Sequence, residues 1–190
     1  LQVYPNIAER SVQVVASIEN TTRWTGHMDV TVSAEVIGRR KEVPIGSRLF
    51  VVRPETGTTK VEYIFPLPAD TPMWDEFDRA MIGLTVETEA MPRAVAIRDT
   101  ISVVFGMREF RTKHGQFVIN DRPAFLRGKN DAALFPLTGY APMDRLEWIR
   151  LLGISAAHGI NHYRFHSWCP PEAAFAAADE LGIYFQVELP

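Results

Sequence analysis

Apolar and polar positions alternate with a period of two up to about Phe105, which is the pattern of half-buried β-strands. The clearest runs are Ser11–Ile18 and Met28–Val36. Similar runs follow at Arg48–Val52, Thr59–Phe65, Ala80–Glu87 and Asp99–Phe105. Short strands separated by Gly, Pro, Asn and Asp predict an antiparallel sandwich with an immunoglobulin-like number of strands. The Cys-Trp-Cys pattern is missing, which excludes an antibody-type domain.

Beyond about Arg108 the pattern changes to strand, helix, strand, helix, strand. A hairpin signal over Gly115–Leu126, with Asn120-Asp121 in its turn, leads into this part. The predicted elements are a strand at Pro123–Gly128, a helix at Asp144–Leu152 with Leu146, Ile149 and Leu152 at helical spacing, a strand around His162–His166, a helix at Glu172–Leu181 ending at Gly182, and a strand at Ile183–Glu188. This order indicates parallel strands joined by right-handed helical crossovers.

The stretch Gly159–Pro171 combines polar, charged and aromatic residues in what otherwise resembles a buried strand. On an extended strand His162, Arg164 and His166 share one face, and Tyr163 and Phe165 share the other. Helices would cover the apolar face and leave the polar face open. Polar groups at the C-terminal ends of parallel strands are typical of sites in (β/α) barrels and doubly wound sheets.

Length, composition and the first residues of the chain add four expectations. A chain of 190 residues that is 46% hydrophobic indicates two domains, for which we expect the ranges 1–105 and 106–190. The net charge of −3, with no basic cluster larger than Arg39-Arg40-Lys41, excludes nucleic acid as a partner. No apolar run is long enough to span a membrane, so no membrane partner is predicted. The start at Leu1, with neither Met nor a signal-peptide pattern, predicts a chain that begins inside a longer protein or after processing.

Single cysteine, tryptophan and histidine residues provide little evidence for a catalytic or metal site. Cys169 is the one cysteine, and we interpret it as a small buried residue in a strand-to-helix turn rather than a nucleophile or ligand. Trp74 is interpreted as an anchor between the sandwich and its neighbour rather than a sugar-stacking residue. On a strand His162 and His166 lie too far apart to chelate one ion, so neither a metal nor a cofactor is predicted.

Several motifs occur in order and together resemble glycoside hydrolase family 2. They are Phe105-Gly-Met-Arg-Glu-Phe110, Phe117-Val-Ile-Asn120, Phe125-Leu-Arg-Gly-Lys-Asn130, Gly159-Ile-Asn161 followed by Arg164 and His166, and Asp179-Glu-Leu-Gly-Ile-Tyr184 followed by Glu188. The resemblance covers nearly the whole chain. It implies that residues 1–105 are the family's immunoglobulin-like sandwich and that residues 106–190 open its catalytic (β/α)₈ barrel, as an incomplete βαβαβ segment.

The resemblance implies retaining hydrolysis of a β-glycosidic bond by two glutamates about 5 Å apart. In the family these glutamates belong to the fourth and seventh barrel strands, and this chain stops after the third. We therefore expect a fragment of a retaining exo-β-glycosidase that binds carbohydrate in the parent protein but is inactive by itself. The alternative is a non-catalytic carbohydrate-binding or interaction module. The resemblance favours a periplasmic or secreted location without fixing it.

The resemblance also implies roles for five residues, none of them a catalytic glutamate. Arg164 would brace the catalytic carboxylates. Asn130 would line the sugar site, with ordinary loop capping as the alternative. Glu188 would support the site or contact the sugar, or else simply pair with Arg164. His166 would bind a sugar hydroxyl, with a core histidine as the alternative. Trp168 would stack on a sugar ring, or else form a lid over the start of a helix.

The truncation itself predicts a partner. Three parallel strands taken from a closed barrel have two free edges and one uncovered face. We expect Phe125 or Leu126, and Tyr184, on that face, and therefore self-association of the fragment.

Overall fold

The computed structural model describes residues 1–38 and 42–189, so the basic cluster Arg39-Arg40-Lys41 lies outside the described residues. The chain forms two compact units. The first contains Leu1–Pro72 and Ala80–Arg108, and the second contains Met73–Arg79 and Glu109–Pro190. The short segment Met73–Arg79 thus belongs to the second unit, although it lies within the range 1–105 that the sequence assigned to the sandwich.

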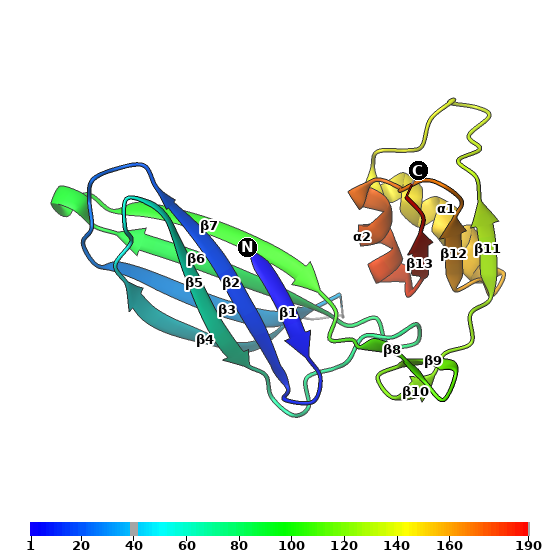
Figure 1. The fold of residues 1–190 in the computed structure, drawn as a ribbon, viewed down its shortest axis with the longest axis horizontal. Helices are drawn as coiled ribbons and strands as arrows, with labels where there is room; N and C mark the ends of the chain where they lie inside the picture. The colour runs from blue at the N-terminus through cyan, green and yellow to red at the C-terminus, as the bar shows by residue number, and fades with distance from the viewer. Residues whose placement is uncertain (39–41, 190) are drawn as a thin grey trace. The chain divides into compact units, whose positions relative to one another are not determined.

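The first unit is a sandwich of two antiparallel sheets (Figure 1). One has the strand order β1-β2-β5 and the other β4-β3-β6-β7. The strands are β1 (Gln2–Asn6), β2 (Ser11–Asn20), β3 (Met28–Ile37), β4 (Val43–Val52), β5 (Gly57–Pro66), β6 (Met81–Ala90) and β7 (Ile97–Phe105), with a short 3-10 turn η1 (Pro92–Ala94) before β7. This architecture agrees with the predicted immunoglobulin-like sandwich.

The interior of the sandwich follows the predicted alternation. Val30 and Val32 on β3, and Ile82 and Leu84 on β6, are almost fully buried. The sequence missed β1, since Pro5 argues against a strand; β1 lies at the edge of its sheet, where a missing N–H is tolerated.

The second unit begins with a small antiparallel sheet of order β10-β9-β8. Its strands are β8 (Phe110–Lys113), β9 (Gln116–Ile119) and β10 (Arg122–Pro123). The predicted turn at Asn120-Asp121 is confirmed, because Ile119 pairs with Arg122 and both turn residues have positive φ, as a two-residue hairpin turn requires.

The rest of this unit is a parallel sheet of order β11-β12-β13 with two helices packed on one face. The elements are β11 (Gly128–Asp131), α1 (Arg145–Ala157), β12 (His162–Phe165), α2 (Glu172–Leu181) and β13 (Tyr184–Val187). The first strand was predicted too early: Pro123 ends β10, and the parallel strand starts at Gly128. Helix α2 ends as predicted, at Gly182 in the left-handed conformation.

The helix face of the sheet carries an aromatic core. Tyr163 and Phe165 of β12 pack with Trp148 and Leu152 of α1 and with the alanines of α2. The predicted apolar stripe of α1 was wrong in part, because Leu146 is exposed. Trp148 and Leu152, four positions apart, form the buried face instead.

Segment Met73–Arg79 packs inside the second unit. Trp74 is buried, its indole Nε1 donates to the Asp179 carbonyl (2.7 Å), and its ring meets Tyr184 edge-on. Glu76 accepts from Asn161 Nδ2 (2.8 Å) and pairs with Arg127 (3.1 Å). Trp74 is therefore a packing residue of the second unit rather than the predicted anchor between the sandwich and its neighbour, and Tyr184 is buried rather than on an uncovered face.

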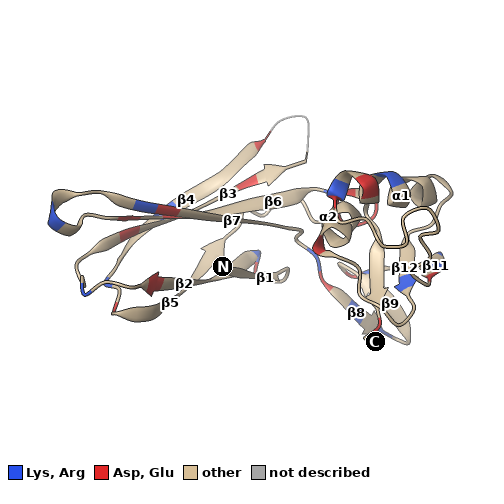
Figure 2. Ribbon diagram, turned by 90° about the horizontal axis from the view of Figure 1, so that it is seen from above, with Lys and Arg blue, Asp and Glu red and all other residues tan. Residues whose placement is uncertain are grey.

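Charge is distributed evenly. Segments with Lys or Arg and segments with Asp or Glu are both scattered over the described parts of the ribbon (Figure 2). None of the described helices is long and apolar enough to cross a membrane. The described residues also contain no group of three or more His, Cys, Asp or Glu side chains placed to hold a metal ion.

Candidate functional site

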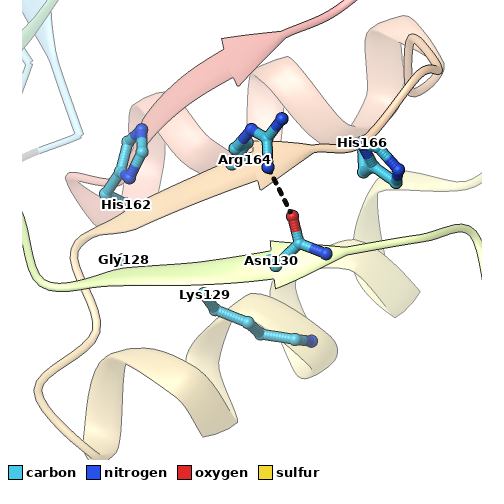
Figure 3. A pocket seen from close by; sticks show the side chains of 6 residues that line it. All are labelled: Gly128, Lys129, Asn130, His162, Arg164 and His166. Carbon is cyan, nitrogen blue, oxygen red and sulfur yellow. Dashed lines mark hydrogen bonds between the residues drawn. The ribbon is translucent and has the colours of Figure 1, made fainter.

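The face of the parallel sheet opposite the helices carries the polar side chains. The register places Asn130 of β11, Arg164 of β12 and Gln186 of β13 in one row across the three strands. A pocket of about 390 Å³ lies on this face (Figure 3), lined by Gly128, Lys129, Asn130, His162, Arg164 and His166. Lys129 itself turns to the other side of β11, where its ammonium lies 4.8 Å from the Tyr163 ring centroid.

Arg164 is the centre of this face. Its Nε donates to Glu188 Oε1 at 2.7 Å, and its Nη2 lies 2.6 Å from the same oxygen. Its Nη1 donates to Asn130 Oδ1 at 3.4 Å, the bond drawn in Figure 3. The planar guanidinium therefore links side chains from all three strand ends, a grip that lysine cannot reproduce.

Glu188 is held by a second set of donors. Its Oε2 accepts from the Ser167 backbone N–H at 3.0 Å and lies 3.3 Å from His166 Nδ1. Ser167 has a φ of 58°, a left-handed conformation that is unusual for a residue other than glycine. That conformation accompanies an N–H group directed at the carboxylate, and strained backbone of this kind concentrates at functional sites.

These donors determine the charge of Glu188. The Ser167 N–H, then Arg164 and His166, lower the pKa of its carboxyl, against a smaller opposing effect of desolvation. Glu188 is therefore ionised at neutral pH. A carboxylate held this way is suited to positioning its neighbours, and poorly suited to donating a proton as a general acid.

His162 closes the other end of the pocket. Its ring packs against Gly128 so closely that a Cβ at this glycine would lie 2.8 Å from His162 Nδ1. Partial burial lowers the pKa of His162, so its ring is neutral at pH 7. No functional role was predicted for His162, and Gly128 was named only as the end of a predicted strand and as part of the motif that ends at Asn130.

Four of the five predicted residues come together: Asn130, Arg164, His166 and Glu188. Trp168 does not join them. Its indole donates to the Asp131 carbonyl (3.2 Å), and its ring packs edge-on against Phe165 and Phe135, on the helix side.

Two further differences from the sequence stand out in the turn after β12. Cys169 was expected to be buried and is exposed, because the buried residue of this turn is Pro170. The Ser167 N–H was missed, because a backbone donor leaves no sign in a residue pattern; an unusual φ becomes visible only in the structure.

The resulting surface is rich in hydrogen-bond donors around one carboxylate. Amide, guanidinium and imidazole groups suit the hydroxyls of a polar ligand such as a sugar. Glu188 is the one glutamate among the described residues that line the pocket or bond to its lining residues. Its carboxylate forms an ion pair with Arg164. Among the described residues, Glu188 therefore has no second glutamate beside it on this face with which to form a retaining pair.

No family model matches the sequence, and no match is found among curated proteins. Solved structures do match. A glycosyl hydrolase family 2 member from Bacteroides cellulosilyticus aligns over 92% of this chain at 18% identity, with a TM-score of 0.77. β-Glucuronidase 2 of Bacteroides uniformis aligns over all of it at 14% identity, with a TM-score of 0.81. A β-glucuronidase of Parabacteroides merdae aligns over all of it at 20% identity, with a TM-score of 0.68.

The chain spans only 22–23% of the length of these neighbours. At such identities the match concerns the fold. It covers the sandwich and the parallel β/α segment together, so that this chain has the fold of a fragment of a glycoside hydrolase family 2 structure.

Proposed function

We propose that this chain is part of a retaining exo-β-glycosidase, with the sandwich at about residues 1–105 and the start of a (β/α)₈ barrel at about residues 106–190. The observation that carries the proposal is the hydrogen-bonded group in which Arg164 links Asn130 and Glu188 at the C-terminal ends of three parallel strands. That end of the strands is where barrel enzymes place their active sites. The matching fold of family 2 structures supports the same assignment.

In this proposal Arg164 and Glu188 are positioning residues. The guanidinium would orient carboxylates supplied by later strands, and the pairing with Glu188 fixes its direction. Asn130 and His166 face the same pocket and would donate hydrogen bonds to sugar hydroxyls. A structure of the Bacteroides uniformis neighbour carries a covalently bound cyclophellitol-6-carboxylate aziridine, which favours a covalent, retaining mechanism for the protein proposed here.

The chain by itself would be inactive. A (β/α)₈ barrel takes about 200 residues or more, and three parallel strands supply too few of its eight. Glu188, the glutamate at this site, already has partners.

Kinetics with an aryl β-glycoside panel test the proposal. A longer protein that includes this chain should hydrolyse at least one member, with retention of anomeric configuration, and the 190-residue chain should hydrolyse none. The proposal fails if the longer protein is inactive on every member. Turnover by the 190-residue chain that disappears in Glu188→Gln would instead make Glu188 a catalyst.

A non-catalytic carbohydrate-binding module is the second candidate. Its support is the ion-paired state of Glu188 and the donor-rich, open pocket. This alternative predicts that the longer protein binds a glycan, seen by calorimetry, without cleaving it.

The proposal also has a consequence for the isolated chain. The sheet β11-β12-β13 has free edges at β11 and β13 among the described strands, and Phe125 and Leu189 are largely exposed. We expect the isolated chain to self-associate through this unit. Light scattering at increasing concentration should show a mass above 21.4 kDa, and a monomer throughout would remove the expectation.

A further inference from the structure

The first unit is open at one end of its interior. A pocket of about 1170 Å³ lies between its two sheets, with Ile18, Met28, Ala90, Ile97 and Ile101 among its lining residues. The described parts of the chain leave it unfilled. Polar residues such as Thr22 and Asp99 also line it, but exposure of the apolar side chains to water is unfavourable, so a segment that covers them would stabilise the unit.

Two isoleucines on β7 show that the opening is an uncovered part of the core. Ile101 pairs with Val86, which is 3% exposed, and Ile97 pairs with Ala90. Cross-strand partners lie on the same face of a sheet, so both isoleucines point into the sandwich. Yet Ile101 is 49% exposed and Ile97 is 55% exposed. The opposite sheet stops short of them.

The register of β2 shows what is missing there. Strand β5 pairs with all of β2, from Ser11 to Asn20, whereas β1 pairs only with Ser11–Val15. In the described chain, the half Ala16–Asn20 therefore has a β-partner on one side only. Alternate backbone groups along this half are directed to the vacant side, as at any sheet edge.

We infer that an extended segment pairs antiparallel with Ala16–Asn20, in line with β1, and that the residues directly before Leu1 in a longer form of the protein supply it. The β1–β2 ladder already runs toward this position, since Gln2 pairs with Val15. Leu1 follows in the same direction and packs, partly buried, against the core. The inference depends on the proposed function only in needing a longer chain.

The ladder also specifies the pattern of the segment. Continuing the register, Leu1 lies opposite Ala16, the position before it opposite Ser17, and the next opposite Ile18. Ser17 is exposed and Ile18 half-buried. The position opposite Ile18 should therefore be apolar and cover Ile97 and Ile101, while the position opposite Ser17 should be polar.

Two extended versions of this chain provide the test. One carries Val-Lys-Val-Thr before Leu1, which directs both valines inward. The control carries Lys-Val-Thr-Val, with the same composition shifted by one position, which directs them outward. Hydrogen exchange by mass spectrometry follows the amides of Ala16–Asn20 and Ile97–Ile101. Exchange there should slow by about tenfold or more in the first version and stay unchanged in the control.

A substitution on β7 provides a second, independent readout. Ile101→Thr should lower the melting temperature of the first version and have little effect on the unextended chain, where this side chain is already half exposed. Equal protection by both extensions, or none by either, overturns the inference. Protection of the unextended chain that grows with its concentration would assign the opening to a second copy and overturn it too. Glycoside hydrolysis is not measured, so the outcome is independent of the proposed activity.

Discussion

Different kinds of internal contact stabilise each of the two units of this protein. The first is closed by aliphatic side chains that alternate inward from two sheets. The second has an aromatic core and, in addition, a set of polar contacts from Met73–Arg79. Asn161, 4% exposed, bonds to Glu76 across 85 positions of sequence. Patterns of apolar residues specify the first unit, whereas the second also requires polar partners from a distant part of the chain.

Of the changes considered for comparing the two units, removal of the Trp74 side chain should cause the largest loss of stability. Trp74→Ala deletes a buried indole and its bond to Asp179, and should destabilise the second unit by about 3–5 kcal/mol. Both α-helices lie in this unit, so circular dichroism at the helical minimum reports its unfolding.

Phe77→Ala is the matched control for Trp74. Phe77 lies on the same segment but is 76% exposed, so its loss should change stability by less than about 0.5 kcal/mol. If Trp74→Ala is equally mild, Met73–Arg79 does not hold the second unit together.

Substitution of Gly182 should cause a smaller loss of stability where α2 meets segment Met73–Arg79. It adopts a φ of 71°, and a Cβ there would lie 2.8 Å from the Glu76 Cα, a backbone atom with little room to move. Gly182→Ala should cost more than about 1 kcal/mol. Gly153→Ala, in α1 with nothing near its added Cβ, should instead stabilise by about 0.5–1 kcal/mol. Chemical denaturation of both variants measures the contrast; equal signs would contradict it.

Glu188 should give the smallest effect, and one that depends on pH. Its folded-state pKa is lowered, so its stabilisation is present above the unfolded value of about 4.3 and is lost as pH falls through the folded value. Glu188→Gln should therefore lower the melting temperature at neutral pH and make no difference once the pH lies below the lowered folded-state pKa. A difference that persists in acid would mean that the ion pair with Arg164 is not its source.

Strand alternation and helix termini were readable from sequence because they depend on neighbouring residues. Alternation located six of the strands in the first unit, and Gly182 marked the end of α2. Strand β11 was predicted at the wrong residues because Pro123–Gly128 has the composition of a strand. Pairing with β12 decides where β11 actually lies. The role of Met73–Arg79 was invisible for the same reason, since its partners are remote in sequence.

The parts of the site that consist of side chains on strands were predictable from the sequence, whereas the parts that depend on backbone conformation were not. Alternation along β12 predicted that Arg164 and Phe165 lie on opposite faces of the sheet. The parallel order of the strands predicted that Asn130 and Glu188 lie near Arg164. The direction of Trp168 depends on the turn at His166 and Ser167, and the positive φ of Ser167 cannot be read from the residue types.

The central claim is that Arg164 positions the reacting groups of a glycosidase, and one comparison of kcat/KM tests it most directly. In the longer protein, Arg164→Lys should reduce kcat/KM for an aryl β-glycoside on the order of 100-fold, because lysine keeps the charge but loses the planar grip on Glu188 and Asn130. Arg98→Lys, which alters an exposed Arg–Glu pair on the sandwich, should leave kcat/KM unchanged. Wild-type kcat/KM in a folded Arg164→Lys protein would contradict the claim and reduce Arg164 to a structural residue.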